Sequence, residues 1–292
     1  MIRNESWDKW YWINNAGIEA GFIMKRNPYI LLLVILTSFS LSCQTVPITG
    51  REQLSFVPAS QILPMSFNQY QDFLSKHTVV EQGEHAALVK RVGSRIEHAV
   101  ERYFAEHGLS SRLTGYQWEF HLVDDKEVNA WCMPGGKVVV YTGILPVTKD
   151  ENGLSVVLGH EIAHAVANHG GERMSQSLLV EMGGLTLDAA LSQNPSKTND
   201  LFLAAYGLGA QVGILLPYSR TQESEADHLG LIFMAMAGYD PHGAVTFWER
   251  MIAAQHGKSP PELLSDHPAD TRRIRNIKEL LPEAMKYYRP ES

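Results

Sequence analysis

A short polar cluster inside an apolar stretch constrains this sequence more than any other feature. Residues 154–167 hold mainly Val, Leu, Ile and Ala, but His160, Glu161 and His164 interrupt them. The length and composition of the stretch predict a buried helix over 153–169. Burying polar and ionisable groups costs free energy unless they are hydrogen-bonded or paired. The sequence therefore predicts that these three side chains meet partners in the core.

The spacing of the two histidines favours a metal site. Positions i and i+4 of a helix lie one turn apart on one face, so His160 and His164 can reach a single ion. Zinc accepts neutral imidazole nitrogens at about 2.0–2.1 Å, a distance that this spacing satisfies. Glu161 lies about 100° around the helix, outside the ligand face but in reach of a water on the metal, for which it would be the general base. The alternative is a pair of histidines that are only hydrogen-bonded in the core.

A catalytic zinc site needs a third protein ligand, and a cluster of carboxylates on the helix predicted over 222–237 can supply it. Glu223 and Asp227 are four residues apart and share a face of that helix. Glu225 points about 200° away from Glu223 and is not expected to join it. One carboxylate of the pair can bind zinc while the other holds a ligating imidazole. The alternative is a solvated helix face, which the apolar stretch at 229–235 disfavours.

The N-terminal region has the features of an export signal. A basic pair at 25–26 precedes an uncharged apolar run at 29–41, and small residues then lead into Cys43. This order is typical of the n-region, h-region and cleavage site of a secretory signal. The thirteen residues of the run are fewer than the roughly 20 that span a bilayer as a helix, so an uncleaved anchor is the alternative. We expect Met24 to be the true start, with residues 1–23 as upstream translation.

The surroundings of Cys43 resemble a bacterial lipoprotein signal, in which the cysteine becomes the lipidated first residue. By the same resemblance, Gln44 rather than Asp after the cysteine favours the outer membrane. We expect 1–42 to be an upstream extension and signal peptide, and 43–58 to be a lipidated tether facing the periplasm. Cys132, the second of the two cysteines, is expected to be a small apolar strand residue.

Composition disfavours two classes of protein. Hydrophobic residues make up 45% and charged residues 20% of the chain, which is typical of globular proteins rather than disordered or many-pass membrane proteins. The formal net charge is −7, and Lys and Arg cluster nowhere outside the N-terminal region. We therefore expect no nucleic-acid partner.

Hydrophobic periodicity predicts an α+β protein that is mainly helical, with a small antiparallel sheet beside the helix that carries the two histidines. Residues 117–122 alternate as a strand with one buried face does, and a second strand at 138–141 follows a Pro-Gly-Gly turn at 134–136. The uncharged stretch at 201–219 is expected to be a buried helix, with a membrane segment as the alternative. Helices are predicted over 60–73, 84–104, 153–169, 172–191, 201–216, 222–237, 241–256 and 270–281.

These features together resemble an M48 metallopeptidase of the exported, soluble, Ste24- and Oma1-like branch. The resemblance covers nearly all of 43–281, and it implies a zincin-like fold over 59–292 with one Zn²⁺ per chain. It also implies endopeptidase activity on misfolded or envelope proteins, with Glu223 as the third ligand. The stretches that carry it are 45–51, 129–137, the zinc motif with 172–176, 219–227, 237–241, Phe247-Trp248 and His267-Pro268.

The resemblance also suggests further site residues. His267 would donate a hydrogen bond to the oxyanion of the reaction or bind zinc in place of water; the alternative is a loop histidine that caps the final helix. Arg273 would assist substrate or oxyanion binding. The strand at 138–141 would be a sheet edge that pairs with an extended substrate, and the alternative is an ordinary hairpin in the core. The substrate-binding residues would be Asn129, Ala130, Gly135, Gly136 and Val138.

Two rival functions remain at this stage. One is an envelope chaperone or scaffold that keeps the fold but cleaves little, although such a protein would not require Glu161. The other is a prenyl-protein endopeptidase like the membrane members of the family, which the lack of several long apolar spans disfavours. The expected partners are protein or peptide substrates and a membrane reached through the lipid; the sequence specifies no oligomeric state.

Overall fold

The structure is a computed structural model that describes residues 43–181, 183, 185–206, 219–255, 263, 267 and 271–290. Contacts divide the chain into two units, Met1–Gln44 and Thr45–Ser292, and the account that follows concerns the second. The expected signal peptide and the expected start at Met24 lie outside the described residues. None of the described helices is long and apolar enough to cross a membrane.

A four-stranded sheet forms the centre of the fold. Its strand order is β3 (Val79–Val80), β4 (Glu119–Val123), β6 (Lys137–Tyr141) and β5 (Ala130–Met133). The outer pairs β3–β4 and β5–β6 are antiparallel, but β4 and β6 run parallel. The sheet is therefore mixed rather than antiparallel as expected. The reason is that the chain leaves β4, forms the outer strand β5 and returns through the hairpin turn into the gap beside β4.

This topology corrects the expected position of the substrate-binding strand. The strand at 138–141 belongs to β6, which pairs with β4 on one side and β5 on the other. Because both backbone edges of β6 are occupied, Val138 cannot pair with a substrate through its main chain. The strands at the two edges of the sheet are β3 and β5.

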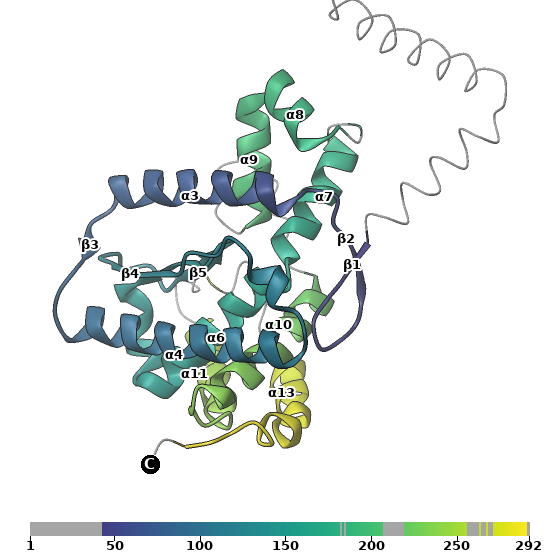
Figure 1. Cartoon of the computed structure of the whole chain (residues 1–292). Coiled ribbons are helices and arrows are strands. Elements are labelled where there is room, and N and C mark those ends of the chain that lie inside the picture. Colours follow the sequence, from purple (N-terminus) through teal and green to yellow (C-terminus); the bar gives the residue numbers. More distant parts are fainter. Residues whose placement is uncertain are drawn as a thin grey trace, which may run out of the picture. The chain divides into compact units, whose positions relative to one another are not determined.

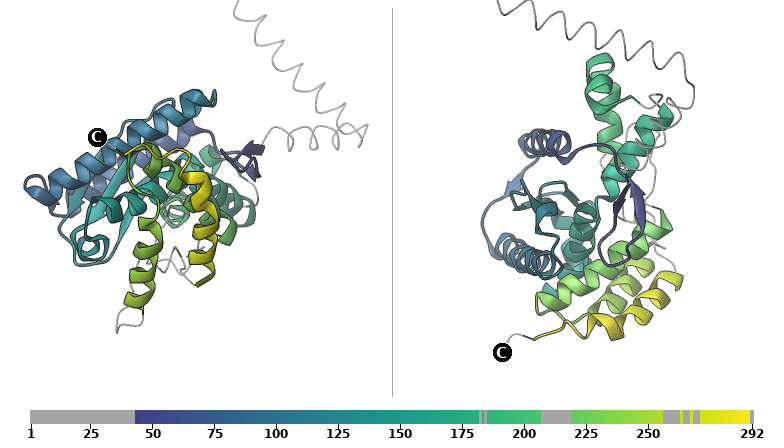
Figure 2. Two further views of the ribbon diagram at one scale, coloured as in Figure 1. Left: turned by 90° about the horizontal axis from the view of Figure 1, so that it is seen from below. Right: turned by 45° about the vertical axis from the view of Figure 1, so that its right-hand side comes forward.

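Helices cover both faces of the sheet, as Figures 1 and 2 show. On one face, Val138 and Val140 pack into a core with α4 (Glu84–Glu106) and α6 (Glu151–Val166). On the other face, Val139 packs with residues of α3 and α7–α9. Successive side chains of β6 thus pack into two different cores, one on each face of the sheet, and for this reason all five of its residues are buried. The remaining helices are α3 (Ala59–Lys76), α5 (Leu145–Thr148), α7 (His169–Glu181), α8 (Leu187–Gln193), α9 (Pro195–Ala205), α10 (Arg220–Met236), α11 (Gly243–Gln255) and α13 (Thr271–Ala284).

The close approach of α6 and α10 positions the polar residues of both helices. A Cβ atom added to Gly159 would lie 2.9 Å from the carbonyl oxygen of Gly230, so the two helices touch backbone to backbone at these glycines. The start of α10 is fixed by a capping box in which the side chains of Ser219 and Gln222 exchange hydrogen bonds with each other's backbone. The first turn of α10 is thereby held beside the middle of α6.

Helix boundaries differ from expectation mainly after α7. The helix expected over 172–191 divides into α7 and α8, and a new helix, α9, begins at Pro195. Proline favours the first turn of a helix because its φ angle is already helical and its missing N–H is not needed there. Residues 207–218, which carry most of the stretch weighed as a membrane segment, lie outside the described residues.

The segment expected to be a tether is packed in its described part. Val46 is 1% exposed, and the side chain of Gln53, 2% exposed, donates a 2.7 Å hydrogen bond to the carbonyl oxygen of Ala167 at the end of α6. Strands β1 (Cys43–Thr45) and β2 (Glu52–Leu54) form a small sheet of their own. Residues 45–58 therefore belong to the compact unit instead of forming a free linker, because their apolar side chains join its core.

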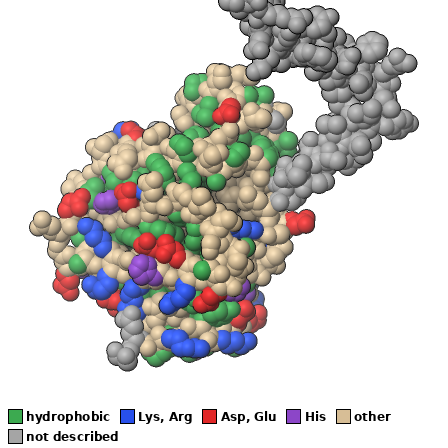
Figure 3. Space-filling model, in the orientation of Figure 1, with side chains coloured by type: hydrophobic (Ala, Val, Ile, Leu, Met, Phe, Trp, Pro, Cys, Tyr) green, Lys and Arg blue, Asp and Glu red, His purple; other side chains and the backbone are tan. Residues whose placement is uncertain are grey.

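The visible face in Figure 3 carries charged side chains of both signs over its lower half, whereas the upper part, over α8 and α9, is mostly uncharged. The exposed large hydrophobic side chains among the described residues, Leu179 and Val180, lie at the end of neighbouring α7. The least polar part of this face is therefore the region of α7–α9.

Candidate metal centre

Helices α6 and α10 bring three of the expected ligands together. The Nε2 atoms of His160 and His164 lie 3.1 Å apart. Glu223, in the first turn of α10, places Oε1 3.2 Å from Nε2 of His164 and Oε2 3.5 Å from Nε2 of His160. The expected face argument is satisfied, because it is Glu223 and not Glu225 that faces the histidine pair.

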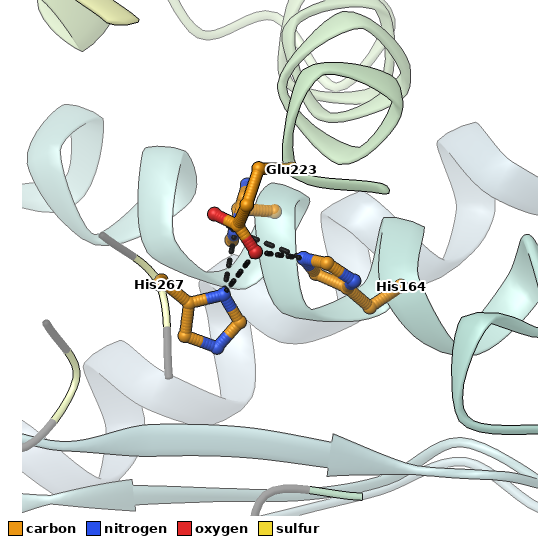
Figure 4. A group of neighbouring side chains, drawn as sticks. His164, Glu223 and His267 are labelled. Carbon is orange, nitrogen blue, oxygen red and sulfur yellow. Dashed lines mark hydrogen bonds and ion pairs between the residues drawn. The ribbon is translucent and has the colours of Figure 1, made fainter. Parts of the chain in front are cut away.

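His267 joins the same cluster from the segment before α13. Its Nδ1 atom lies 3.1 Å from Nε2 of His160 and 2.8 Å from Oε1 of Glu223. Figure 4 shows His164, Glu223 and His267 pointing toward one another. One ligand atom from each of the four residues lies within 4.8 Å of the others, and all four side chains are buried.

The donor set fits a zinc ion. In a tetrahedral site with Zn–N bonds of 2.0–2.1 Å, neighbouring nitrogen atoms are about 3.3 Å apart. The observed separations of His160 Nε2 from His164 Nε2 and from His267 Nδ1 are both 3.1 Å. Three imidazole nitrogens and a carboxylate oxygen converging at this spacing in a buried site are the ligands that zinc prefers.

The electrostatics favour the ligating forms of His164 and Glu223. Burial lowers the pKa of His164 well below its ordinary value and so keeps the ring neutral. Burial alone would raise the pKa of Glu223, but His267, Arg273 and His160 outweigh it and hold that pKa well below the usual range. A neutral imidazole and an ionised carboxylate are the states in which these side chains bind a metal.

The other ring nitrogen of His160 is held by a carboxylate. Its Nδ1 atom lies 3.0 Å from Oδ1 of Asp227, one helical turn after Glu223. Burial and Arg273 lower the pKa of His160, but Glu223 and Asp227 together raise it above its ordinary value. This contact places Asp227 where a carboxylate can orient the imidazole so that Nε2 faces the cluster, the role predicted for it.

Arg273 lies behind these carboxylates. Its Nε and Nη2 atoms donate to the two oxygens of Asp227 at 2.9 and 2.7 Å, and Nη1 lies 2.8 Å from Oε2 of Glu223. The guanidinium also stacks 3.4 Å from the ring centroid of Trp248. These contacts favour a role in positioning Asp227 and Glu223 over the expected help to a substrate or an oxyanion.

Glu161 lies next to the ligand cluster without being part of it. The side chain is 4% exposed, and Oε1 lies 3.6 Å from Nε2 of His267. A carboxylate beside the metal but off the ligand face is where a general base for metal-assisted hydrolysis must stand.

A second group of polar side chains, to which the sequence analysis gave no role, lies behind His164. Nδ1 of His169 is 2.9 Å from Nδ1 of His164, and Nε2 of His169 is 3.1 Å from Oε2 of Glu225. Glu225 in turn binds Arg51, which also binds Glu172. The signal that could have found His169 is its position in the polar stretch directly after the zinc motif; Arg51 gives no local signal, because it is far away in the sequence.

The expected substrate residues divide into two groups. Asn129 and Ala130 lie at the start of the edge strand β5, whereas Val138 is central. Gly135 and Gly136 form the hairpin turn with φ angles of +84° and +79°, and side chains there would collide with Phe67 and Trp118. Their carbonyl oxygens already accept hydrogen bonds from the backbone N–H groups of Gln117 and Glu119. The turn and its packing account for the two glycines, and their expected contact with a substrate stays a prediction.

Cys132 is not among the residues of the described centre. Cys132 on β5 is buried, 7% exposed, and unoxidised, as expected of an apolar strand residue. For Cys43 the structure describes only the backbone, at the start of β1, so its expected lipidation stays a prediction.

Comparison with known proteins agrees with this centre. The sequence profile described as Peptidase family M48 matches residues 91–281, which include every residue of the metal cluster. The chain is 38% identical over 244 residues to the mitochondrial metalloendopeptidase OMA1 of Schizosaccharomyces pombe, covering 82% of this chain and 66% of that protein.

Two more distant relatives come from other lineages. The human mitochondrial metalloendopeptidase OMA1 is 32% identical over 249 residues, 82% of this chain and 46% of that protein. The beta-barrel assembly-enhancing protease of Escherichia coli strain K12 is 23% identical over 261 residues, 86% of this chain and 51% of that protein. The chain thus spans between about half and two thirds of the length of these relatives.

Proposed function

The chain belongs to peptidase family M48, and on that premise we propose that it is a zinc-dependent endopeptidase that hydrolyses peptide bonds in proteins. The observation that carries the proposal is the buried cluster of His160, His164, Glu223 and His267 beside the carboxylate of Glu161. A purely structural histidine cluster would not need a further buried carboxylate next to it.

The chain's own residues divide the work of hydrolysis. His160, His164 and Glu223 would hold a zinc ion, which would supply Lewis acidity to polarise the scissile carbonyl and to make water a nucleophile at neutral pH. Glu161 accepts the proton of the attacking water on its carboxylate, and the water oxygen adds to the carbonyl carbon. Glu161 then delivers the proton to the leaving amine as the C–N bond breaks. Asp227 meanwhile holds the Nδ1 proton of His160, so that Nε2 stays directed at the ion.

We assign the extended substrate to the edge strand β5 (Ala130–Met133). Within the described residues, β5 pairs with β6 on one side only, and it packs against α6, which carries the zinc motif. A peptide that adds a strand to this edge gains main-chain hydrogen bonds beside the site. In an added strand, every second amide N–H of the peptide points to β5. Of two peptide inhibitors N-methylated at alternate amides, the one methylated at the amides that face β5 should lose affinity, and the one methylated at the other amides should keep it. Equal affinity of the two inhibitors would contradict strand addition.

For His267 the geometry favours a fourth ligand over an oxyanion donor. Its Nδ1 atom lies within the ligand cluster, and Nε2 faces Glu161. A histidine there occupies the position that an open catalytic site keeps for water or substrate, and the protein would then be held in a resting state. His267→Ala should raise basal turnover; lowered turnover with unchanged zinc content would favour the oxyanion role instead.

We propose the bacterial cell envelope as the location, with Cys43 as the lipidated first residue and a peptidase domain that begins at residue 45 and not at the expected residue 59. The basic pair and the apolar run before Cys43 support export. The names of the relatives point to mitochondria for some and to β-barrel assembly for others. Mass spectrometry of the mature N-terminus tests the proposal, and a start anywhere other than Cys43 would contradict it.

Cleavage of unfolded casein tests the enzymatic proposal itself. The purified full chain should cleave casein, and a zinc chelator should abolish cleavage. The same preparation carrying Glu161→Gln is the control for a contaminating protease and should stay inactive. A chain that binds zinc and unfolded protein but cleaves neither casein nor peptides would instead support the chaperone alternative.

A further inference from the structure

A continuous line of polar contacts leads from the N-terminal segment to a metal ligand. Arg51 binds Glu225 through Nε and Nη2 at 2.9 and 3.0 Å. Glu225 Oε2 lies 3.1 Å from Nε2 of His169, and Nδ1 of His169 lies 2.9 Å from Nδ1 of His164. The ring of His169 is 0% exposed. Water therefore does not reach the ring, and its two nitrogens depend on these contacts.

Only one arrangement of protons satisfies every contact in this line while leaving His164 able to bind a metal. Nε2 of His164 faces the ligand cluster and must keep its lone pair, so Nδ1 carries the proton. That proton is donated to Nδ1 of His169, which must then be an acceptor. The proton of His169 is consequently on Nε2, from where it is donated to the carboxylate of Glu225. Each ring nitrogen is then either a donor or an acceptor, and the next group in the line, as far as the carboxylate of Glu225, determines which.

We propose that His169 and Glu225 are positioning residues for the metal ligand His164, and that Arg51 holds Glu225 in place for this purpose. The inference rests on the proposed zinc site and adds to it the means by which one ligand keeps its tautomer and ring orientation. His169 does for His164 what Asp227 does for His160, but with an imidazole placed between the ligand and the carboxylate.

The surroundings of Glu225 agree with this role. Besides Arg51, the carboxylate accepts a 2.8 Å hydrogen bond from the hydroxyl of Thr49. Both donors come from the turn between β1 and β2, so the segment at 49–51 closes the line from outside the helices. Glu172 accepts further hydrogen bonds from Nη1 and Nη2 of Arg51 at 2.8 Å, whereas His169 donates to Glu225. Glu172 thus offers a matched control for Glu225.

Metal affinity and ligand geometry are the measurements that test the inference. Zinc dissociation constants come from competition with a chelator, and the visible absorption spectrum of the Co²⁺-loaded protein reports the geometry around the ion. His169→Phe keeps the size of the ring but removes both hydrogen bonds, and it should weaken zinc binding by about 10–100-fold. Glu225→Gln should also weaken it and should shift the cobalt bands. Both measurements use the purified full chain.

Two variants separate positioning from general damage. His169→Asn can still accept from Nδ1–H of His164 through its side-chain oxygen, so its zinc affinity should return toward that of the parent. Glu172→Gln removes a charge beside Arg51 but keeps the hydrogen bonds that join His164, His169 and Glu225, and it should leave both affinity and the cobalt spectrum close to the parent. Thermal unfolding of the metal-free proteins shows whether each variant is folded.

The outcomes are distinguishable. If the parent binds zinc and His169→Phe binds it equally well, the positioning role is overturned. Equal weakening by Glu172→Gln and Glu225→Gln would likewise overturn it, since a general loss of the charge cluster would then explain both. If His169→Phe does not fold, Glu225→Gln compared with Glu172→Gln decides the matter. A parent that binds no zinc would contradict the proposed function itself.

Discussion

The two histidines of the zinc motif are held in different ways. On one side, Nδ1 of His160 meets the carboxylate of Asp227 directly, at 3.0 Å. On the other side, Nδ1 of His164 meets the imidazole of His169, which only then meets a carboxylate, that of Glu225. Both Nε2 atoms nevertheless face the same point. The contrast shows that one requirement, a fixed tautomer, is met by two constructions.

The two sides also draw on different parts of the chain. Asp227 is bound by the fully enclosed Arg273, which follows it in the C-terminal half and stacks on Trp248. Glu225 is bound by Arg51, whose side chain is 27% exposed and which precedes the stretch matched by the family profile. The His160 side is therefore built within the peptidase core. The His164 side depends on an N-terminal segment that packs onto it.

The largest effect should come from the residue that serves both sides. Glu223 lies between the two histidines, so Glu223→Ala should abolish stoichiometric zinc binding. Glu225→Ala removes a carboxylate of the same helix that supports only His164. This variant should still bind zinc when the zinc concentration is high. Elemental analysis of the purified variants gives the answer. Zinc retained by Glu223→Ala would contradict the claim that Glu223 is a metal ligand between the two histidines.

The next effect concerns chemistry without binding. Glu161 belongs to neither side, so Glu161→Gln should keep stoichiometric zinc. It should lose general-base catalysis, which contributes roughly 10²–10⁴-fold to the rate. Turnover of unfolded casein, measured together with zinc content, checks both halves of this prediction. Near-parental turnover would contradict the assigned mechanism.

A third prediction compares the stability of the two sides in the metal-free protein. Asp227→Ala takes from the buried guanidinium of Arg273 the carboxylate that it binds through two nitrogens, and breaking such a buried pair costs about 3–5 kcal/mol. Glu225→Ala should cost less, because Arg51 is partly exposed and keeps Glu172. Urea denaturation of the two variants and the parent measures the difference. An equal loss of unfolding free energy in the two variants would show that the His164 side is as enclosed as the His160 side.

The smallest effect should come from Arg51, because two other residues, Glu225 and His169, stand between it and the metal ligand His164. Arg51→Met should weaken zinc binding less than Glu225→Gln does, because Glu225 keeps the hydrogen bond from Thr49. Lys76→Met, at an exposed cation far along α3, is the matched control and should change nothing. Chelator competition resolves the order. A loss from Arg51→Met larger than that from Glu225→Gln would mean that the segment acts on the site by another route.

The sequence predicted the metal ligands better than the residues that hold the ligands in place, and the reason is physical. His160, His164 and Glu223 follow from helical spacing, which is local and regular. The position of His267 could be proposed from resemblance, but its place among the ligands depends on how a distant segment packs. The link from Arg51 to Glu225 joins positions 174 residues apart, and no local pattern encodes it.

The sheet illustrates the same limit. The alternation at 117–122 and the hairpin turn predicted strands correctly, because periodicity and turn chemistry are local. Strand order is not local: the position of β6 between β4 and β5 depends on which free edge the hairpin docks against. The strand at 138–141 therefore lies inside the sheet and not at its expected edge, and the hairpin of β5 and β6 corresponds to the alternative that the sequence left open.

X-ray absorption at the zinc edge of the purified chain tests the central claim most directly. A centre formed by His160, His164, His267 and Glu223 should show only nitrogen and oxygen neighbours, with three imidazoles. His267→Ala should reduce the count to two imidazoles and keep the metal. A sulfur neighbour at about 2.3 Å, or a parent spectrum with fewer than two imidazoles, would contradict the account.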